Sequence, residues 1–155
     1  MADAPDHAEI RVIPPVIFAA FLAAGLEAAH FLPGHLLPRA AATACGGALI
    51  LASALVVQSA LRAMRRARTT VHPHGRATAL VRDGAFRVSR NPLYLGLLLL
   101  FAGLSFLANS PWMLALAAPL LAALRLIAIG PEERYLEARF GPAYRAYRAE
   151  VRRWL

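Results

Sequence analysis

Four apolar stretches, separated by polar segments, define the pattern of this chain of 155 residues. They cover residues 13–32, 40–61, 92–108 and 111–129 and hold few charged side chains. A helix of 20 residues is about 30 Å long, which matches the hydrocarbon core of a bilayer. The pattern predicts an all-α fold in which residues 1–155 form one domain, an integral membrane bundle of four transmembrane helices.

The polar segments between these stretches differ in length. Residues 33–39 form a short turn flanked by prolines, and residues 109–111 (Asn-Ser-Pro) form a second one. The connection from 62 to 91 is much longer and carries eight arginines against one acid, Asp83. Because cytoplasmic loops are enriched in basic residues, we expect this connection and both termini to lie in the cytoplasm.

The C-terminal tail, residues 130–155, has the pattern of an amphipathic helix at the membrane interface. Pro131 predicts a helix start, with Glu132 and Glu133 in the first turn. Apolar and aromatic side chains then recur every three or four residues: Leu136, Phe140, Tyr144, Tyr147, Val151 and Trp154. Gly141 and Pro142 should break this helix into two pieces.

Composition narrows the class of partner. Hydrophobic residues make up 59% of the chain and charged residues 17%, which is too apolar for a soluble domain of this size. The net charge is +8, and all 17 basic residues are arginine. They lie between the apolar stretches, where membrane lipids are the expected partner, and not in a groove with stacking aromatics, which argues against nucleic acid. The single Cys45 excludes a cysteine-based metal site, and no metal is predicted.

Two polar motifs should meet at one end of the bundle. Arg90, Asn91 and Pro92 precede the third apolar stretch, whereas Glu132 and Glu133 follow the fourth. Since a short turn joins these stretches, they run antiparallel and the two motifs become neighbours in space. A cleft with a polar rim and an apolar floor is typical of a ligand site.

The residues around these motifs match a family pattern. The run GAFRVSRNPLYLG at 84–96 is followed by Glu132-Glu133, Leu136, Phe140-Gly141, Tyr144, Tyr147 and Val151. From Thr69 to the C-terminus the chain resembles the isoprenylcysteine carboxyl methyltransferase family, which is related to the membrane phospholipid methyltransferases. The resemblance is to short bacterial members, so we expect a bacterial inner-membrane protein.

This resemblance implies an enzyme that transfers a methyl group from S-adenosylmethionine. The acceptor would be lipid-soluble or membrane-associated, with a carboxylate, thiol or amine that enters from the lipid side. The cofactor pocket would lie on the cytoplasmic side. Carried over by position, its lining is Arg90, Asn91, Pro92 and Tyr94 on one side, Glu132 and Glu133 on the other, and Tyr144 and Tyr147 in the roof.

The chemistry of this cofactor suggests a role for several of these side chains. Arg90 is suited to bind the methionyl carboxylate, and Glu132 or Glu133 the methionyl ammonium. The ring of Tyr94 can attract the sulfonium by a cation–π interaction. Asn91 stands where the eukaryotic isoprenylcysteine enzymes have histidine, and the chain lacks their additional spans, which leaves the acceptor open.

The catalytic candidates are Arg125 and Glu132. Arg125 lies about 10 Å into the apolar layer, where arginine is costly and therefore a functional candidate. It is expected to reach towards Glu132 or an acidic group of cofactor or substrate, although a side chain that snorkels to the interface explains it as well. Glu27 lies about 21 Å from the cytoplasmic end of the first stretch, too far from Glu132 for a role there, so Glu27 and His30 are expected to form a pair at the outer interface.

Two other functions fit parts of the pattern. A membrane NADPH-dependent reductase of the sterol-reductase type has a similar C-terminal hairpin and tail, and the arginines of the connection would suit its dinucleotide phosphate. A small four-span transporter fits the chain length and Glu27. It would not need the long basic connection or the aromatic tail.

Overall fold

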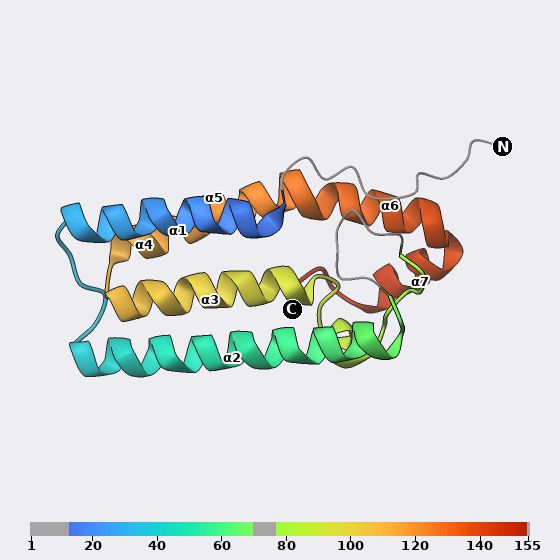
Figure 1. Ribbon diagram of the computed structural model, residues 1–155, viewed down its shortest axis with the longest axis horizontal. Coiled ribbons are helices and arrows are strands. Elements are labelled where there is room, and N and C mark those ends of the chain that lie inside the picture. Colours follow the sequence, from blue (N-terminus) through green and yellow to red (C-terminus); the bar gives the residue numbers. More distant parts are fainter. Residues whose placement is uncertain (1–12, 70–76, 155) are drawn as a thin grey trace.

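The computed structural model describes residues 13–69 and 77–154; residues 1–12, 70–76 and 155, which include part of the predicted connection, lie outside it. In this described part the chain is helical and contains no strand, so the predicted all-α fold is confirmed (Figure 1). The elements are α1 (Pro14–Phe31), α2 (Arg39–Arg66), the 3₁₀ turn η1 (Gly84–Arg87), α3 (Pro92–Ala108), α4 (Pro111–Ala115), α5 (Ala117–Leu124), the π turn η2 (Arg125–Ile129), α6 (Gly130–Phe140) and α7 (Pro142–Glu150).

Three helices are long and apolar enough to cross a membrane. They are α1, α2 and the continuous rod from α4 to α6, Pro111–Phe140. The third predicted span, α3, is apolar but has only 17 residues. It is about 25 Å long, which is less than the hydrocarbon core of about 30 Å. Of the four predicted spans, three are therefore supported by length and composition.

The fourth span continues into the tail helix. Pro131, Glu132 and Glu133 lie in the first turn of α6, as predicted, but η2 joins α5 to α6 without a break. In the π turn the Gly130 N–H donates to the carbonyl of Arg125, five residues earlier. A proline ring clashes with the carbonyl four residues before it in a regular α-helix, and the wider turn opens the helix at this point. The predicted break at Gly141 is confirmed, since this residue has φ +53° between α6 and α7.

Small residues bring α2 and α3 close together. A Cβ on Gly46 would lie 2.8 Å from the carbonyl oxygen of Gly103, so this crossing depends on glycine. The Ser53 hydroxyl donates to the carbonyl of Gly96 at 2.7 Å, farther along the same contact. Such packing of small residues is typical of helix pairs in membranes. It fixes the start of α3 against α2, where the polar motif lies.

The helices end at different heights, which leaves room beside the start of α3. The second helix is longer than predicted, because it ends at Arg66 and not at Leu61. Figure 1 shows both α2 and α6 extending past the first turn of α3, with α7 folded back beside them. At the opposite end lie the two short turns, joined by the side chain of Asn109. The polar end and the turn end of the bundle are therefore separated by its full length.

Candidate functional site

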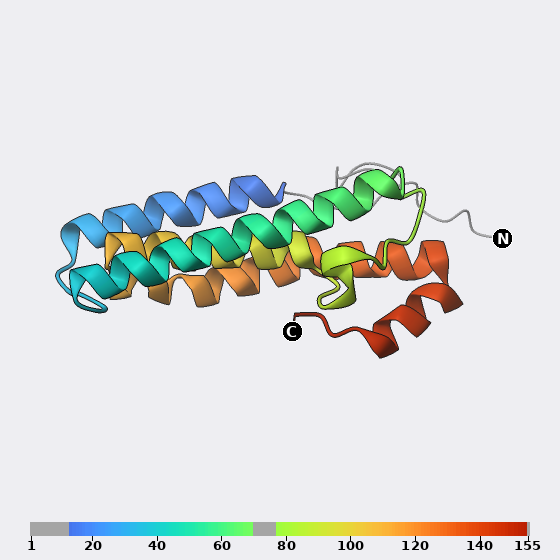
Figure 2. The ribbon, with the colours of Figure 1, turned by 90° about the horizontal axis from the view of Figure 1, so that it is seen from below.

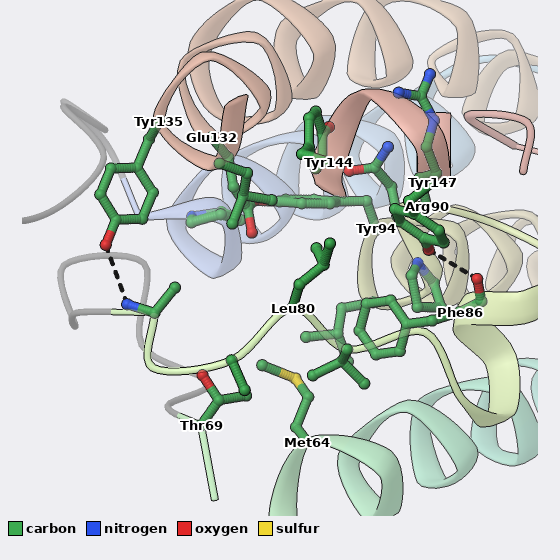
Figure 3. Close-up of a pocket in the computed structure, with 18 of the residues that line it drawn as sticks. Met64, Thr69, Leu80, Phe86, Arg90, Tyr94, Glu132, Tyr135, Tyr144 and Tyr147 are labelled. Atoms are coloured by element: carbon green, nitrogen blue, oxygen red, sulfur yellow. Dashed lines mark hydrogen bonds between the residues drawn. The ribbon is translucent and has the colours of Figure 1, made fainter. Parts of the chain in front are cut away.

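A cavity of about 460 Å³ lies at the polar end of the bundle (Figure 3). This volume is within the range of small-molecule sites, roughly 300–1,000 Å³. Its wall is built from the start of α1, the end of α2, the connection, the first turns of α3, and α6 and α7. The described lining residues are Ile13, Pro14, Pro15, Val57, Met64, Thr69, Ala77, Ala79, Leu80, Val81, Phe86, Arg90, Asn91, Pro92, Leu93, Tyr94, Leu97, Glu132, Tyr135, Leu136, Tyr144 and Tyr147.

The polar wall joins the two predicted motifs. Tyr94, in the first turn of α3, donates its hydroxyl hydrogen bond to Oε2 of Glu132 at 2.7 Å. These residues are 38 positions apart in sequence and meet because α3 and the α4–α6 rod run antiparallel. The bond fixes the Glu132 carboxylate at the cavity wall. Arg90, Asn91 and Pro92 line the same cavity.

Three buried polar atoms at this wall make no hydrogen bond, although Nη1 of Arg90 lies 3.7 Å from Oε1 of Glu133. The Arg90 side chain is only 9% exposed, and its Nε and Nη1 make no hydrogen bond. The hydroxyl of Tyr144, a residue 1% exposed, also has none. A buried donor left without an acceptor costs about 1–3 kcal/mol, and more when it is charged. These donors therefore suit an anionic ligand such as a carboxylate.

The neighbouring carboxylate, Glu133, is engaged elsewhere. Arg153 binds it with a two-pronged contact, Nε to Oε1 at 3.0 Å and Nη2 to Oε2 at 2.6 Å. Asn91 precedes α3, but its side chain does not cap that helix. It donates instead to Oε1 of Glu133 at 3.5 Å and to the Arg153 carbonyl at 3.4 Å. Of the two adjacent acids, Glu132 lines the cavity and Glu133 lies behind its wall.

The roof of the cavity is α7. Tyr147 donates from its hydroxyl to the carbonyl of Phe86 at 2.7 Å, and the Arg82 guanidinium lies 5.7 Å from its ring centre. Arg82 also donates through Nη2 to the Ala143 carbonyl. Burial raises the pKa of Tyr147 to about 12. Burial and then the charge of Glu133 raise the pKa of Tyr144 to about 12. Both phenols therefore stay protonated, and remain donors, at neutral pH.

The opposite wall is apolar. It is formed by the start of α1 at residues 13–15, by Val57 and Met64 of α2, and by Leu93 and Leu97 of α3. All of these come from helices that are apolar along most of their length. The cavity therefore combines a charged end with a wall suited to a hydrocarbon chain.

A model of phospholipid methyltransferases matches residues 41–143, more than half of the chain. The chain belongs to the phospholipid methyltransferase family. This confirms the related-family resemblance inferred from residues 84–96 and the tail. No curated protein and no solved structure matches the chain. The three apolar helices and the family together make it an integral membrane protein.

Arg125 lies apart from the cavity of this methyltransferase. It is the first residue of η2, its side chain is exposed, and it is not among the lining residues. The sequence suggested that it reaches Glu132, but the structure does not bring the two side chains together. Glu27 and His30 are likewise exposed, and His30 borders the turn end of the bundle.

Several residues of the cavity wall were not predicted. The connection closes one side of the cavity with Leu80, Val81 and Phe86, and the hydroxyl of Tyr135 accepts a hydrogen bond from the Ala77 N–H at 3.0 Å (Figure 3). The sequence signal that could have indicated this contact is the apolar pair Leu80-Val81 within an otherwise basic segment. Arg153 was also missed, because six arginines occur in the tail and nothing in their spacing singles it out.

Proposed function

We propose that this protein is an S-adenosylmethionine-dependent methyltransferase that modifies a membrane-associated lipid or small molecule. Membership of the phospholipid methyltransferase family supports the reaction class and does not favour a reductase or a transporter. The observation that carries the choice of cofactor is that one cavity contains both the Glu132 carboxylate and Arg90 donors that make no hydrogen bond. An amino acid head group presents the two complementary charges.

The cavity residues divide the binding of this cofactor between them. Arg90 and the hydroxyl of Tyr144 would bind the methionyl carboxylate, and Glu132 the methionyl ammonium. The Tyr94 hydroxyl holds Glu132 in place, and the ring of Tyr94 would attract the sulfonium. Asn91, Pro92 and Tyr147 would shape the pocket around it. Glu133 and Arg125 are left out of the binding set, because neither lines the cavity.

The protein's part in the reaction is alignment and exclusion of water. When bound, S-adenosylmethionine supplies a methyl group that is transferred by direct displacement at sulfur-bound carbon. The cavity wall would have to hold the reacting partners at a distance of productive approach, roughly 3–3.5 Å. The roof formed by α7 keeps water away from the site. Proper positioning is therefore the main requirement on these residues.

The acceptor is expected to be nucleophilic without help from a strong base. Among the described lining residues Glu132 is the only carboxylate, and it would be occupied by the ammonium group. This favours a carboxylate, thiol or amine over an alcohol. The apolar wall from α1 to α3 would hold the hydrocarbon part of such a molecule. The arginines at this end favour a cytoplasmic position for the cavity in a bacterial inner membrane.

The test combines binding with product analysis. Titration of purified protein with S-adenosylmethionine should show binding, and Glu132→Gln should weaken it at least about tenfold, as loss of a charged hydrogen bond predicts. Arg125→Gln, on the exposed face of η2, is the control and should bind normally. Mass spectrometry of lipids labelled from a methyl-tritiated donor would then identify the acceptor class. Tight binding of NADPH in competition with S-adenosylmethionine would contradict the proposal.

A further inference from the structure

The chain turns back between α6 and α7, and after α7 it continues to the start of α3 (Figure 2). There the backbone N–H of Arg90 donates to the carbonyl of Arg152 at 3.0 Å. The hydroxyl of Ser89 donates to the carbonyl of Arg153 at 3.0 Å. Two consecutive carbonyls of the tail are thus bound to the turn that carries Arg90. Arg152 and Arg153 are therefore attached to the polar wall of the cavity itself.

A charged contact fastens the same segment to α6. The guanidinium of Arg153 binds both oxygens of Glu133, with side-chain exposures of 33% and 14%. A two-pronged contact between guanidinium and carboxylate fixes orientation as well as distance. Asn91 donates both to Glu133 and to the Arg153 carbonyl. We call this arrangement of Glu133, Arg153 and Asn91 the tail clasp.

The tail clasp lies at one end of the roof. The roof helix α7 follows Gly141, whose positive φ makes a sharp bend, and its first residues are held by Arg82 at Ala143. Its far end is followed by an extended residue, Val151, and is held where Arg153 meets Glu133. The distance from Oε1 of Glu133 to Nη1 of Arg90 is 3.7 Å, so the charge of the tail clasp also faces the Arg90 side chain without a hydrogen bond to it. Breaking the contact between Arg153 and Glu133 would release the end of α7 and would also free Glu133, which lies beside Arg90.

We infer that Glu133 is a positioning residue that closes the roof of the cavity by holding Arg153, and that it does not touch the methyl donor. This inference rests on the proposed function, because the closed roof is what raises affinity for S-adenosylmethionine. It assigns different tasks to two adjacent acids: Glu132 binds and Glu133 closes. It also gives the last residues of the chain, which lie beyond the family match ending at residue 143, a part in the site.

The test uses steady-state kinetics of the full-length protein with variants at both partners. Glu133→Gln and Arg153→Gln should each raise the KM for S-adenosylmethionine about tenfold, with kcat changed less than about twofold, as expected for lost binding without lost chemistry. The double variant should be no worse than Glu133→Gln alone, because that variant already removes the contact with Arg153. Arg153→Lys keeps the charge but not the two-pronged contact, and should recover about a third of the loss.

Arg148→Gln is the matched control. It removes an ion pair between α7 and α6, Arg148 to Glu137 at 3.0 Å, that lies outside the tail clasp and is exposed. It should leave KM unchanged, since exposed ion pairs contribute little. Additive effects of the two clasp variants, or a fall in kcat at unchanged KM for Glu133→Gln, would overturn the inference.

Hydrogen exchange separates this inference from the proposed function. Without any ligand, Arg153→Gln should speed amide exchange over residues 142–154 about tenfold relative to Arg148→Gln, because the end of α7 opens more often. Equal exchange in the two variants would overturn the tail clasp even if S-adenosylmethionine binds normally. Faster exchange in a protein that fails to bind S-adenosylmethionine would instead overturn the proposed function and with it the part of the tail clasp in donor affinity.

Discussion

The two ends of the bundle differ in whether their buried polar side chains form hydrogen bonds within the protein. At the turn end, Oδ1 of Asn109 accepts from the N–H groups of Leu36 and Leu37, and its Nδ2 donates to the Leu37 carbonyl. At the cavity end, Nε and Nη1 of Arg90 and the hydroxyl of Tyr144 are buried without partners. A polar group that the protein itself satisfies stabilises the fold, whereas one left unsatisfied is available to a ligand. The difference distinguishes the turn end from the end where we propose that a ligand binds.

Replacing Arg90 should give the largest effect on function. Arg90→Ala should weaken S-adenosylmethionine binding roughly 10- to 100-fold, because hydrogen bonds to charged groups contribute about 1.5–3 kcal/mol. Stability without ligand should change less than affinity, since Nε and Nη1 make no hydrogen bond and only the 3.7 Å ion pair of Nη1 with Glu133 is lost. Calorimetric titration and thermal unfolding measure the two quantities. Arg87→Ala, at an exposed arginine of η1, is the control and should change neither. If Arg90→Ala were strongly destabilised and its folded fraction still bound S-adenosylmethionine normally, the contrast between the two ends would be contradicted.

Replacing Asn109 should give the opposite result. Asn109→Ala removes three hydrogen bonds and places alanine at φ +53°, so we expect a loss of about 2 kcal/mol in the free energy of unfolding. Glycine adopts φ +53° without strain, so the loss in free energy of unfolding for Asn109→Gly reports the hydrogen bonds alone. Both variants should bind S-adenosylmethionine normally once folded. A tenfold change in affinity would show that the two ends are not independent.

The two buried tyrosines of α7 reproduce this contrast within one helix. Tyr147→Phe loses the hydrogen bond to Phe86 and should lower stability by about 1 kcal/mol, with little change in donor affinity. Tyr144→Phe removes a hydroxyl without a partner, so stability should hold while affinity for S-adenosylmethionine falls about threefold to tenfold. Chemical unfolding and calorimetric titration of both variants provide the measurement. Identical behaviour of the two variants would contradict the proposed carboxylate site.

The general position of the site could be predicted from the sequence. A short turn at Asn109 forces the third and fourth apolar stretches to run antiparallel, and this alone brings Tyr94 near Glu132. The family pattern then supplied the reaction class, and the family match supports it. These inferences needed only the order of elements along the chain and the length of one turn.

The separate positions of Glu132 and Glu133 relative to the cavity could not be predicted. Adjacent residues on a helix point about 100° apart, so only the helix rotation decides whether Glu132 or Glu133 faces the cavity. That rotation depends on the extra residue of η2, and the pattern gave no sign of a π turn. The same turn leaves Arg125 exposed. The choice of Arg153 among the tail arginines depends on how far the chain folds back, which spacing does not encode.

Replacing Trp112 at the turn end should have the smallest effect. Its Nε1 donates to the carbonyl of Pro33 at 2.8 Å, but the residue is 48% exposed. After Trp112→Phe, water can reach the freed carbonyl, so we expect a loss within about 0.5 kcal/mol and unchanged donor affinity. Thermal unfolding beside Asn109→Ala gives the comparison. A loss in the free energy of unfolding as large as that of Asn109→Ala would mean that burial does not determine the cost of breaking these hydrogen bonds. The buried atoms of Arg90 and Tyr144 that make no hydrogen bond would then no longer indicate a binding site.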